Sequence, residues 1–175
     1  MSQVLSFRAK VREDRCARTQ RIPMTSYLID INVWLALSWG LHPHSKAAHA
    51  WLASLSPIEA RLLFCRITQL GLLRLLANKA VMGDSVLNVG NAVGMLDRWS
   101  EDPRVEFAVE PLGLDATFRR TLRRFTNLYA TKTIMDVYLA AFAEAEQATV
   151  VTLDRGLARI AKRINVPHVV FGTRH

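Results

Sequence analysis

The sequence predicts an α/β protein in which helices cover both faces of a central parallel sheet of about five strands. Short apolar segments of strand character alternate with longer segments whose apolar residues recur at helical spacing. Such alternation is typical of parallel sheets, because each connection between parallel strands needs a crossover, usually a helix. The chain has 175 residues and a mass of 19.7 kDa, which indicates a single domain with a substantial core.

The first strand is predicted at residues 27–30, a short apolar segment that follows Met24. Helices are predicted at 32–39 and 45–55, and Gly40 and Pro43 separate them. In the second helix the apolar side chains recur at helical spacing, and they are Ala47, Ala48, Trp51, Leu52 and Leu55.

The middle of the chain continues the alternation. Ser56–Glu59 is typical of a turn or a helix start, and a second strand is predicted at 61–65. Leucine-rich residues 68–78 predict a helix, and 86–99 predict another that Gly90 and Gly94 weaken. The remaining elements are a strand at 105–109, helices at 114–125 and 133–146, a strand at 149–153, a helix at 157–164 and a strand at 168–171.

The charge of the chain points to a polyanionic or acidic partner. There are 23 Lys and Arg residues against 15 Asp and Glu, a net charge of +8. Half of the excess lies in residues 1–23, which lack clear apolar periodicity, so we predict a disordered or loosely docked basic arm before a single domain at 24–175. Three explanations of the arm remain open: translation begins at Met24, the arm binds nucleic acid, or it is an uninvolved tail.

Composition also bears on location. No apolar run approaches the roughly 20 residues of a membrane helix, and the first residues lack the apolar core of a secretory signal. Cys16 and Cys65 lie far apart without metal-type spacing, which indicates two reduced thiols and a cytoplasmic protein.

Three aspartates stand where chemistry gathers in α/β proteins. Asp30 and Asp154 close predicted strands, and Asp136 lies at the start of a predicted helix. In an open α/β sheet, sites form at the carboxyl ends of the strands. Each residue also has a structural interpretation, because Asp30 and Asp154 suit N-caps and Thr133–Asp136 matches a capping box.

Taken together, the aspartates predict a divalent-metal site. Mg²⁺ and Mn²⁺ prefer carboxylate oxygens, activate water and neutralise phosphate charge. A basic surface around an acidic pocket suits hydrolysis of a phosphodiester, and capping is compatible with that role.

Four segments resemble, in order, the motifs of PIN-domain nucleases. Leu28–Trp34 resembles the opening motif LxDTNVL, and Arg66–Leu75 resembles the second motif. Ile134–Ala141 resembles the third, usually TDAYLLA, and Val151–Leu157 resembles the fourth, TLDRGL. The likeness is strongest to the VapC toxin group of bacterial toxin–antitoxin pairs, especially the branch with a TQNGFLR-like second motif.

The resemblance implies a three-layer α/β/α fold and an endoribonuclease that depends on Mg²⁺ or Mn²⁺. It also implies a homodimer and neutralisation by a small VapB-type antitoxin. Carried over, Asp30 and Asp136 are the primary metal ligands, and Asp154 completes the cluster directly or through water. Asn32 steadies Asp30 or the helix start, and Gln69 occupies the place of a common Glu.

Three departures keep a second interpretation open. Ile31 replaces a Thr whose hydroxyl commonly braces the first aspartate, Gln69 brings no charge, and Gly156 removes a further acid. The alternative is a weak or inactive PIN domain that binds RNA or a partner. A phosphatase of the haloacid dehalogenase type is disfavoured, because Asn32 stands where that motif needs an acid.

Other polar clusters have weaker functional interpretations. The histidines at 42, 44 and 49 lack the spacing of a zinc site and suit surface or packing roles. The basic run of Arg119, Arg120, Arg123 and Arg124, together with Lys132 and Arg155, is open to RNA contact or to a solvated helix face. Thr152 is placed to hydrogen-bond near Asp154.

Overall fold

The protein is described by a computed structural model that covers residues 24–125 and 131–171. The predictions for residues 1–23, Cys16 included, lie outside the described residues. In the described part no helix combines the length and the apolar character needed to span a membrane.

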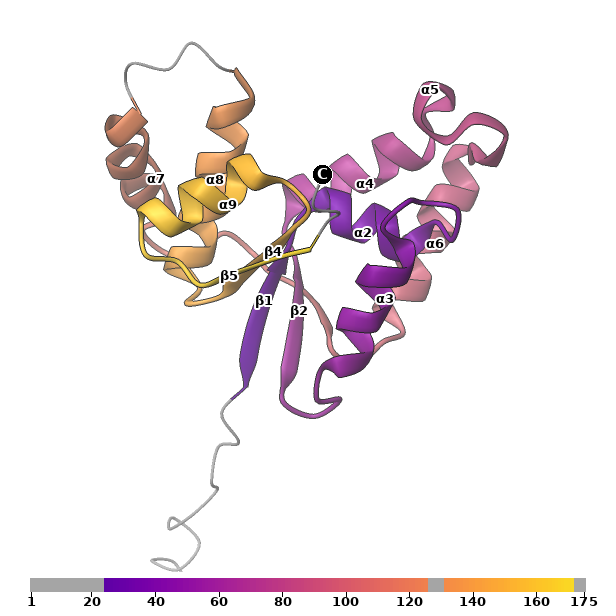
Figure 1. Ribbon diagram of the computed structural model, residues 1–175, viewed down its shortest axis with the longest axis horizontal. Helices are drawn as coiled ribbons and strands as arrows, with labels where there is room; N and C mark the ends of the chain where they lie inside the picture. The colour runs from indigo at the N-terminus through magenta and orange to yellow at the C-terminus, as the bar shows by residue number, and fades with distance from the viewer. Residues whose placement is uncertain (1–23, 126–130, 172–175) are drawn as a thin grey trace, which may run out of the picture.

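The centre of the structure is a five-stranded sheet in the order β3-β2-β1-β4-β5 (Figure 1). All neighbouring strands are parallel, as predicted. The strands are β1 (Thr25–Ile29), β2 (Ala60–Phe64), β3 (Val105–Phe107), β4 (Thr149–Thr152) and β5 (His168–Val170). Because β1 is central, the chain builds outward from it in both directions.

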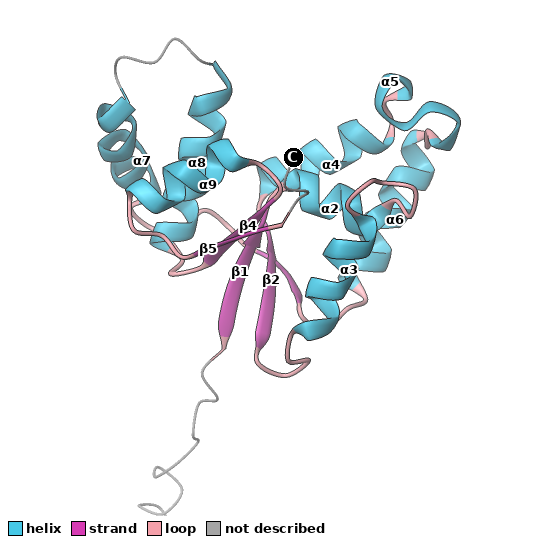
Figure 2. Cartoon of the chain, viewed as in Figure 1, coloured by secondary structure: helices cyan, strands magenta, loops and turns pink. Residues whose placement is uncertain are grey.

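Helices cover both faces, which makes the three layers that the resemblance implied (Figures 1 and 2). One layer holds α2 (Ile31–Ser38), α3 (Ser45–Ser54), α4 (Arg66–Leu76), α5 (Lys79–Met82) and α6 (Val89–Ser100). The other holds α7 (Leu114–Leu122), α8 (Thr131–Ala145) and α9 (Arg155–Arg163). Short 3₁₀ turns, η1 (Gly83–Ser85) and η2 (Arg123–Phe125), follow α5 and α7.

Each strand divides its side chains between two cores. Leu28 of β1 packs into the core under α7, α8 and α9, while the next residue, Ile29, packs under α2 and α4. Successive side chains of a strand point to opposite faces, so a strand buried on both faces must be apolar throughout. In the second core, Trp34 stacks on Phe64 with 3.7 Å between ring centroids.

A close approach joins α2 to α4. A Cβ atom at Gly71 of α4 would lie 2.5 Å from Cδ1 of Ile31, a distance that real Cβ atoms essentially never show. Gly71 therefore lets the Ile31 side chain pack against the backbone of α4. The large side chain at position 31 is thus accommodated by packing against α4.

Most predicted elements are present, and one prediction was wrong. Residues 79–85, for which no element was predicted, form α5 and η1, and Asn78 caps α5 by accepting from the Ala80 N–H. The capping box at Thr133–Asp136 is not formed, because α8 already includes Thr131, and its first turn has no acidic residue. Thr and Asp are tolerated inside a helix that tertiary packing stabilises. The sequence pattern alone therefore did not locate the start of α8.

Candidate functional site

The sheet reverses its winding direction between β1 and β4. After β1 the chain enters α2 on one face, and after β4 it enters α9 on the other. In open α/β sheets a crevice forms at such a switch point, outside the carboxyl ends of the two strands. Asp30 follows β1 and Asp154 lies just beyond β4, so both stand at this crevice.

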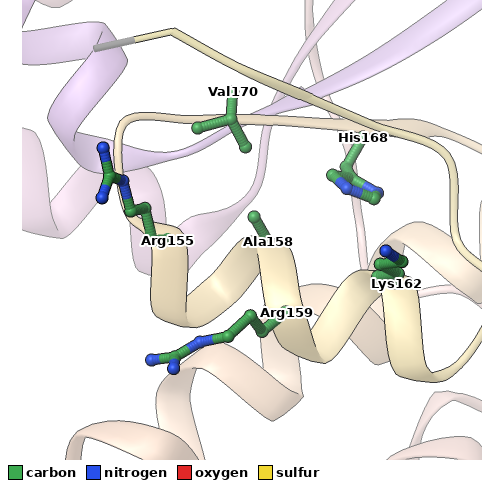
Figure 3. Close-up of a pocket in the computed structure, with 6 residues that line it drawn as sticks. All are labelled: Arg155, Ala158, Arg159, Lys162, His168 and Val170. Atoms are coloured by element: carbon green, nitrogen blue, oxygen red, sulfur yellow. The ribbon is translucent and has the colours of Figure 1, made fainter. Parts of the chain in front are cut away.

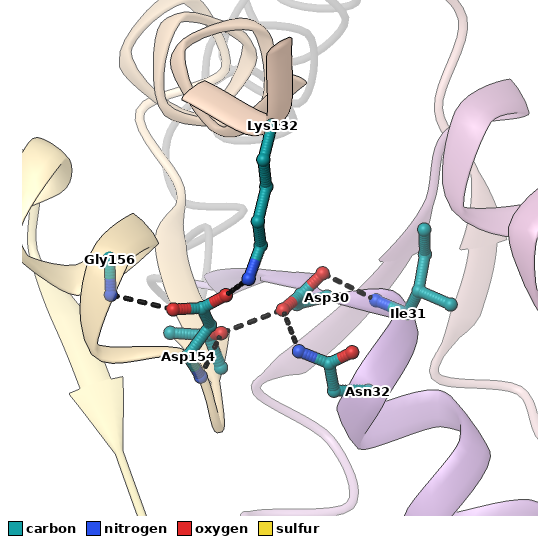
Figure 4. Close-up of polar contacts among 7 residues, drawn as sticks. Asp30, Ile31, Asn32, Lys132, Asp154 and Gly156 are labelled. Carbon is teal, nitrogen blue, oxygen red and sulfur yellow. Dashed lines mark hydrogen bonds and ion pairs between the residues drawn. The ribbon is translucent and has the colours of Figure 1, made fainter. Parts of the chain in front are cut away.

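Asp30 is the more deeply buried of these two carboxylates, with 7% of its surface exposed. It is the N-cap of α2, where one oxygen accepts from the Ile31 N–H at 2.7 Å. Its other oxygen accepts from Asn32 Nδ2 at 2.9 Å and from Thr152 Oγ1 at 2.7 Å (Figure 4). Both the predicted cap and the predicted support from Asn32 are confirmed.

Thr152 links the two strand ends. Parallel pairing places Ile29 beside Val151, so the next residues along, Asp30 and Thr152, are neighbours. The buried Thr152 hydroxyl donates to Asp30 and accepts from the Asp154 N–H at 2.8 Å. This hydroxyl braces the first aspartate from the neighbouring strand, although residue 31 carries none.

Asp154 is the N-cap of α9 and forms an ion pair with Lys132. One of its oxygens accepts from the Gly156 N–H at 2.6 Å, as an N-cap should. The other accepts from the Lys132 ammonium, which reaches down from the first described turn of α8 (Figure 4). Lys132 is predominantly exposed, so this contact lies at the surface of the protein.

Asp136 faces the same spot from α8. A Cβ atom placed at Gly156 would lie 2.9 Å from Asp154 Oδ1 and 3.6 Å from Asp136 Oδ2. The two oxygens are therefore no farther apart than the sum of those distances. Three aspartates from distant parts of the chain meet at the switch point, with Gly156 leaving room between two of them.

The pKa values of the three aspartates reflect their burial and the repulsion between their negative charges. Burial of the half-buried Asp136 carboxyl, and then the nearby Asp154 charge, raise its pKa to about 6. Burial also raises the pKa of Asp30, against the Thr152 hydrogen bond. Partial burial opposes the charged form of Asp154, but the Lys132 and Gly156 hydrogen bonds outweigh it and lower its pKa. The folded protein therefore keeps these negative charges close together at a cost in free energy. A bound cation would lower that cost.

The donor set suits a hard divalent cation, because it consists of carboxylate oxygens. Within the described residues, however, no three His, Cys, Asp or Glu side chains lie close enough to hold one ion as they stand. Lys132 is drawn to the same charges, and its hydrogen bond to Asp154 raises its pKa. The side chains present fit a divalent cation in kind, and the Lys132 ammonium competes with such a cation for Asp154.

Gln69 lies apart from the acidic cluster in its contacts. It is on the first turn of α4, and its Oε1 accepts from the Arg66 guanidinium at 2.5 Å. The part of the chain that the structure describes shows no hydrogen bond between Gln69 and an aspartate. Its role in catalysis stays a prediction.

The other polar clusters take structural roles. His42 accepts from the His44 N–H, and His49 pairs with Ser45, so the structure brings these histidines to no metal site among the described residues. In the basic run, Arg119 pairs with Asp115 and Arg120 with Glu144. The sequence reasoning missed the link from Lys132 to Asp154, since 22 residues separate them and no local pattern signals it.

Comparison with known proteins agrees with this geometry. The model of the PIN domain family matches residues 27–163, which takes in all three aspartates. This chain belongs to the PIN domain family. It is 39% identical to Ribonuclease VapC41 of Mycobacterium tuberculosis over 131 residues, covering 73% of this chain and 88% of the relative. That likeness places it with the VapC-type members of the family.

Solved structures share the fold. VapBC2 from Rickettsia felis, solved with a DNA fragment from the promoter, aligns with a TM-score of 0.60 at 17% identity, over 83% of this chain and 98% of that chain. VapBC-1 from nontypeable Haemophilus influenzae aligns with a TM-score of 0.60 at 15% identity, over 83% and 98%. At these identities the likeness shows the architecture alone.

Proposed function

We propose that this PIN domain is a metal-dependent endoribonuclease of the VapC type, the toxin of a toxin–antitoxin pair. One observation carries the proposal: Asp30, Asp136 and Asp154 meet at the switch point of the sheet, in a chain 39% identical to a protein named as a ribonuclease. The aspartates would hold Mg²⁺ or Mn²⁺, with Asp30 and Asp136 as the primary ligands.

The chemistry is hydrolysis of an RNA phosphodiester. When bound, the cation supplies a Lewis acid and a water of lowered pKa. The aspartates orient it, and Thr152 and Asn32 hold Asp30 in one rotamer through the hydrogen bonds described above. Water adds to phosphorus, one ester oxygen leaves, and the proton from water passes to that leaving oxygen.

Cleavage of RNA by the purified chain tests the proposal. We expect cleavage with Mn²⁺ or Mg²⁺, none with EDTA, and a loss on the order of 100-fold or more in Asp30→Asn and Asp136→Asn. Asp97→Asn is the matched control, because Asp97 is an exposed aspartate on α6 and is not part of the acidic cluster. If the two site variants cleave as fast as the control, the assignment of these residues is wrong.

The partners follow from the same assignment. We propose that a small VapB-type antitoxin neutralises the enzyme, that two copies form a homodimer, and that the protein acts on RNA in the cytoplasm. The structural neighbours described above are VapBC proteins, which supports a VapB-type partner. Sedimentation of the purified chain, alone and co-expressed with the product of a small adjacent reading frame, measures both associations.

The alternative is a PIN domain that binds RNA without cleaving it. The charge-neutral Gln69 and the Lys132 contact to Asp154 favour it. Calorimetry with Mn²⁺ separates the two, since a nuclease site binds the ion and loses it in Asp136→Asn. The brace from Thr152 removes one reason for the alternative, because the hydroxyl missing at residue 31 is supplied from β4.

A further inference from the structure

A basic hollow lies between α9 and the edge strand β5. It has a volume of about 370 Å³ and is lined by Arg155, Ala158, Arg159, Lys162, His168 and Val170. In Figure 3, Ala158 of α9 and Val170 of β5 face one another across it, and Arg155 and Lys162 lie toward opposite ends. Of the described residues that line it, none is acidic.

The lining residues share one stripe of α9. Arg155, Arg159 and Lys162 stand at positions i, i+4 and i+7, which lie on one helical face. All three are exposed at the surface. This spacing is visible in the sequence, and it is the pattern from which a basic helix face could have been predicted here.

One end of the hollow is lined by the residue that follows Asp154 in the chain. Arg155 directly follows Asp154, and the stripe from Arg155 to Lys162 extends about 10 Å along the helix at 1.5 Å per residue. A nucleic-acid strand with one phosphate at the aspartates would present further phosphates to this stripe. At the 3.4 Å axial spacing of phosphates in a duplex strand, about three would lie along it.

The charges of Arg159 and Lys162 are available for such a contact. None of the ion pairs among the described residues involves Arg159 or Lys162. Other basic side chains of the domain are already paired with carboxylates, namely Arg61, Arg104, Arg119, Arg120 and Lys132. A row of cations beside the proposed nuclease site suits a polyanion, and the phosphate backbone of a nucleic acid is the polyanion that such a site acts on.

We propose that the hollow between α9 and β5 binds the phosphate backbone of single-stranded RNA and guides the substrate away from the aspartates. The inference rests on the proposed nuclease function, because the substrate defines the strand that must leave the crevice. Arg159 and Lys162 are the phosphate contacts, and Ala158 and Val170 make the apolar floor and wall against which a ribose or base packs.

The test is the salt dependence of RNA binding. Asp136→Asn provides a background that does not cleave, and a labelled single-stranded RNA of about 16 nucleotides spans the usual site sizes. Fluorescence anisotropy follows binding between about 50 and 200 mM KCl. The pocket variant adds Arg159→Gln and Lys162→Gln, and the control adds Lys79→Gln and Arg98→Gln, which are exposed in the opposite helical layer.

The loss of two phosphate contacts should change both the affinity for RNA and its salt dependence by amounts that can be calculated. Each contact to a single strand contributes about 0.7 to the slope of log affinity against log salt, or about fivefold in affinity at 0.1 M. We therefore expect the pocket variant to lose about 25-fold in affinity and about 1.4 in slope. The control keeps both values, and the exchanged pair Arg159→Lys with Lys162→Arg restores them.

Two results would overturn the proposal: a pocket variant whose affinity and slope equal those of the control, or a background protein that binds no RNA. Cleavage of RNA by the unmodified chain, and its loss in Asp30→Asn, test the nuclease function separately. If cleavage is present while the pocket variant binds normally, only the hollow is refuted. If the unmodified chain does not cleave, the nuclease fails, and with it the assignment of the hollow to a substrate.

Discussion

Replacing Asp136 by Asn should stabilise the metal-free protein. The folded state raises the pKa of this carboxyl from an ordinary 3.8 to about 6 through burial and the nearby Asp154 and Asp30 charges. That difference corresponds to about 3 kcal/mol against the charged form. Because the side chain is half-exposed, solvent screening reduces this to about 1.5 kcal/mol. Asn is neutral at every pH and removes the repulsion.

The sign of the pH dependence follows from the raised pKa. A carboxyl whose pKa is raised on folding binds its proton more tightly in the folded state, so its contribution to stability falls as pH rises from about 4 to about 6. The advantage of Asp136→Asn over the unmodified chain is therefore full above about pH 7 and vanishes near pH 4.

Thermal unfolding in EDTA measures this advantage. About 1.5 kcal/mol in a domain of this size raises Tm by roughly 3–6 °C at about pH 7.5. Asp97→Asn on α6, which carries the same chemical change far from the cluster, should leave Tm unchanged. Addition of Mn²⁺ should then raise the Tm of the unmodified chain and not that of Asp136→Asn. Equal melting of Asp136→Asn and the unmodified chain near neutral pH, or a gain that persists at pH 4, would refute the reasoning.

Three further substitutions test the supports of the site. Thr152→Val removes the buried hydroxyl that Asp30 accepts from and should cost about 1–3 kcal/mol in urea unfolding, whereas Thr152→Ser should keep most of that stability. Gly71→Ala places a Cβ 2.5 Å from Ile31 Cδ1 and should cost about 1–3 kcal/mol. Ile31→Val in the same chain should restore part of that loss, and additive losses in the double-mutant cycle would contradict the contact. Lys132→Met removes the ammonium that competes for the acidic cluster and should tighten Mn²⁺ binding up to about fivefold by calorimetry, so an unchanged or weaker affinity would speak against competition.

The sequence alone determined most of the elements and named all three carboxylates. Strands such as 149–152 and helices such as α9 follow from apolar periodicity, which depends on neighbouring residues. Asp30 and Asp154 were correctly predicted as caps for the same reason, since a cap is a contact between adjacent residues. Motif order then supplied Asp136, whose local pattern had suggested a helix start that the structure does not have.

Only the tertiary structure decided how these residues meet. Placing β4 beside β1 joins Thr152 to Asp30 across 122 positions of the chain, and packing α8 over the same strand ends brings Lys132 and Asp136 to Asp154. The hollow between α9 and β5 likewise exists because β5 pairs with β4 at the edge of the sheet. Such contacts depend on strand order and crossover handedness, which act across the whole chain, and no short segment encodes them.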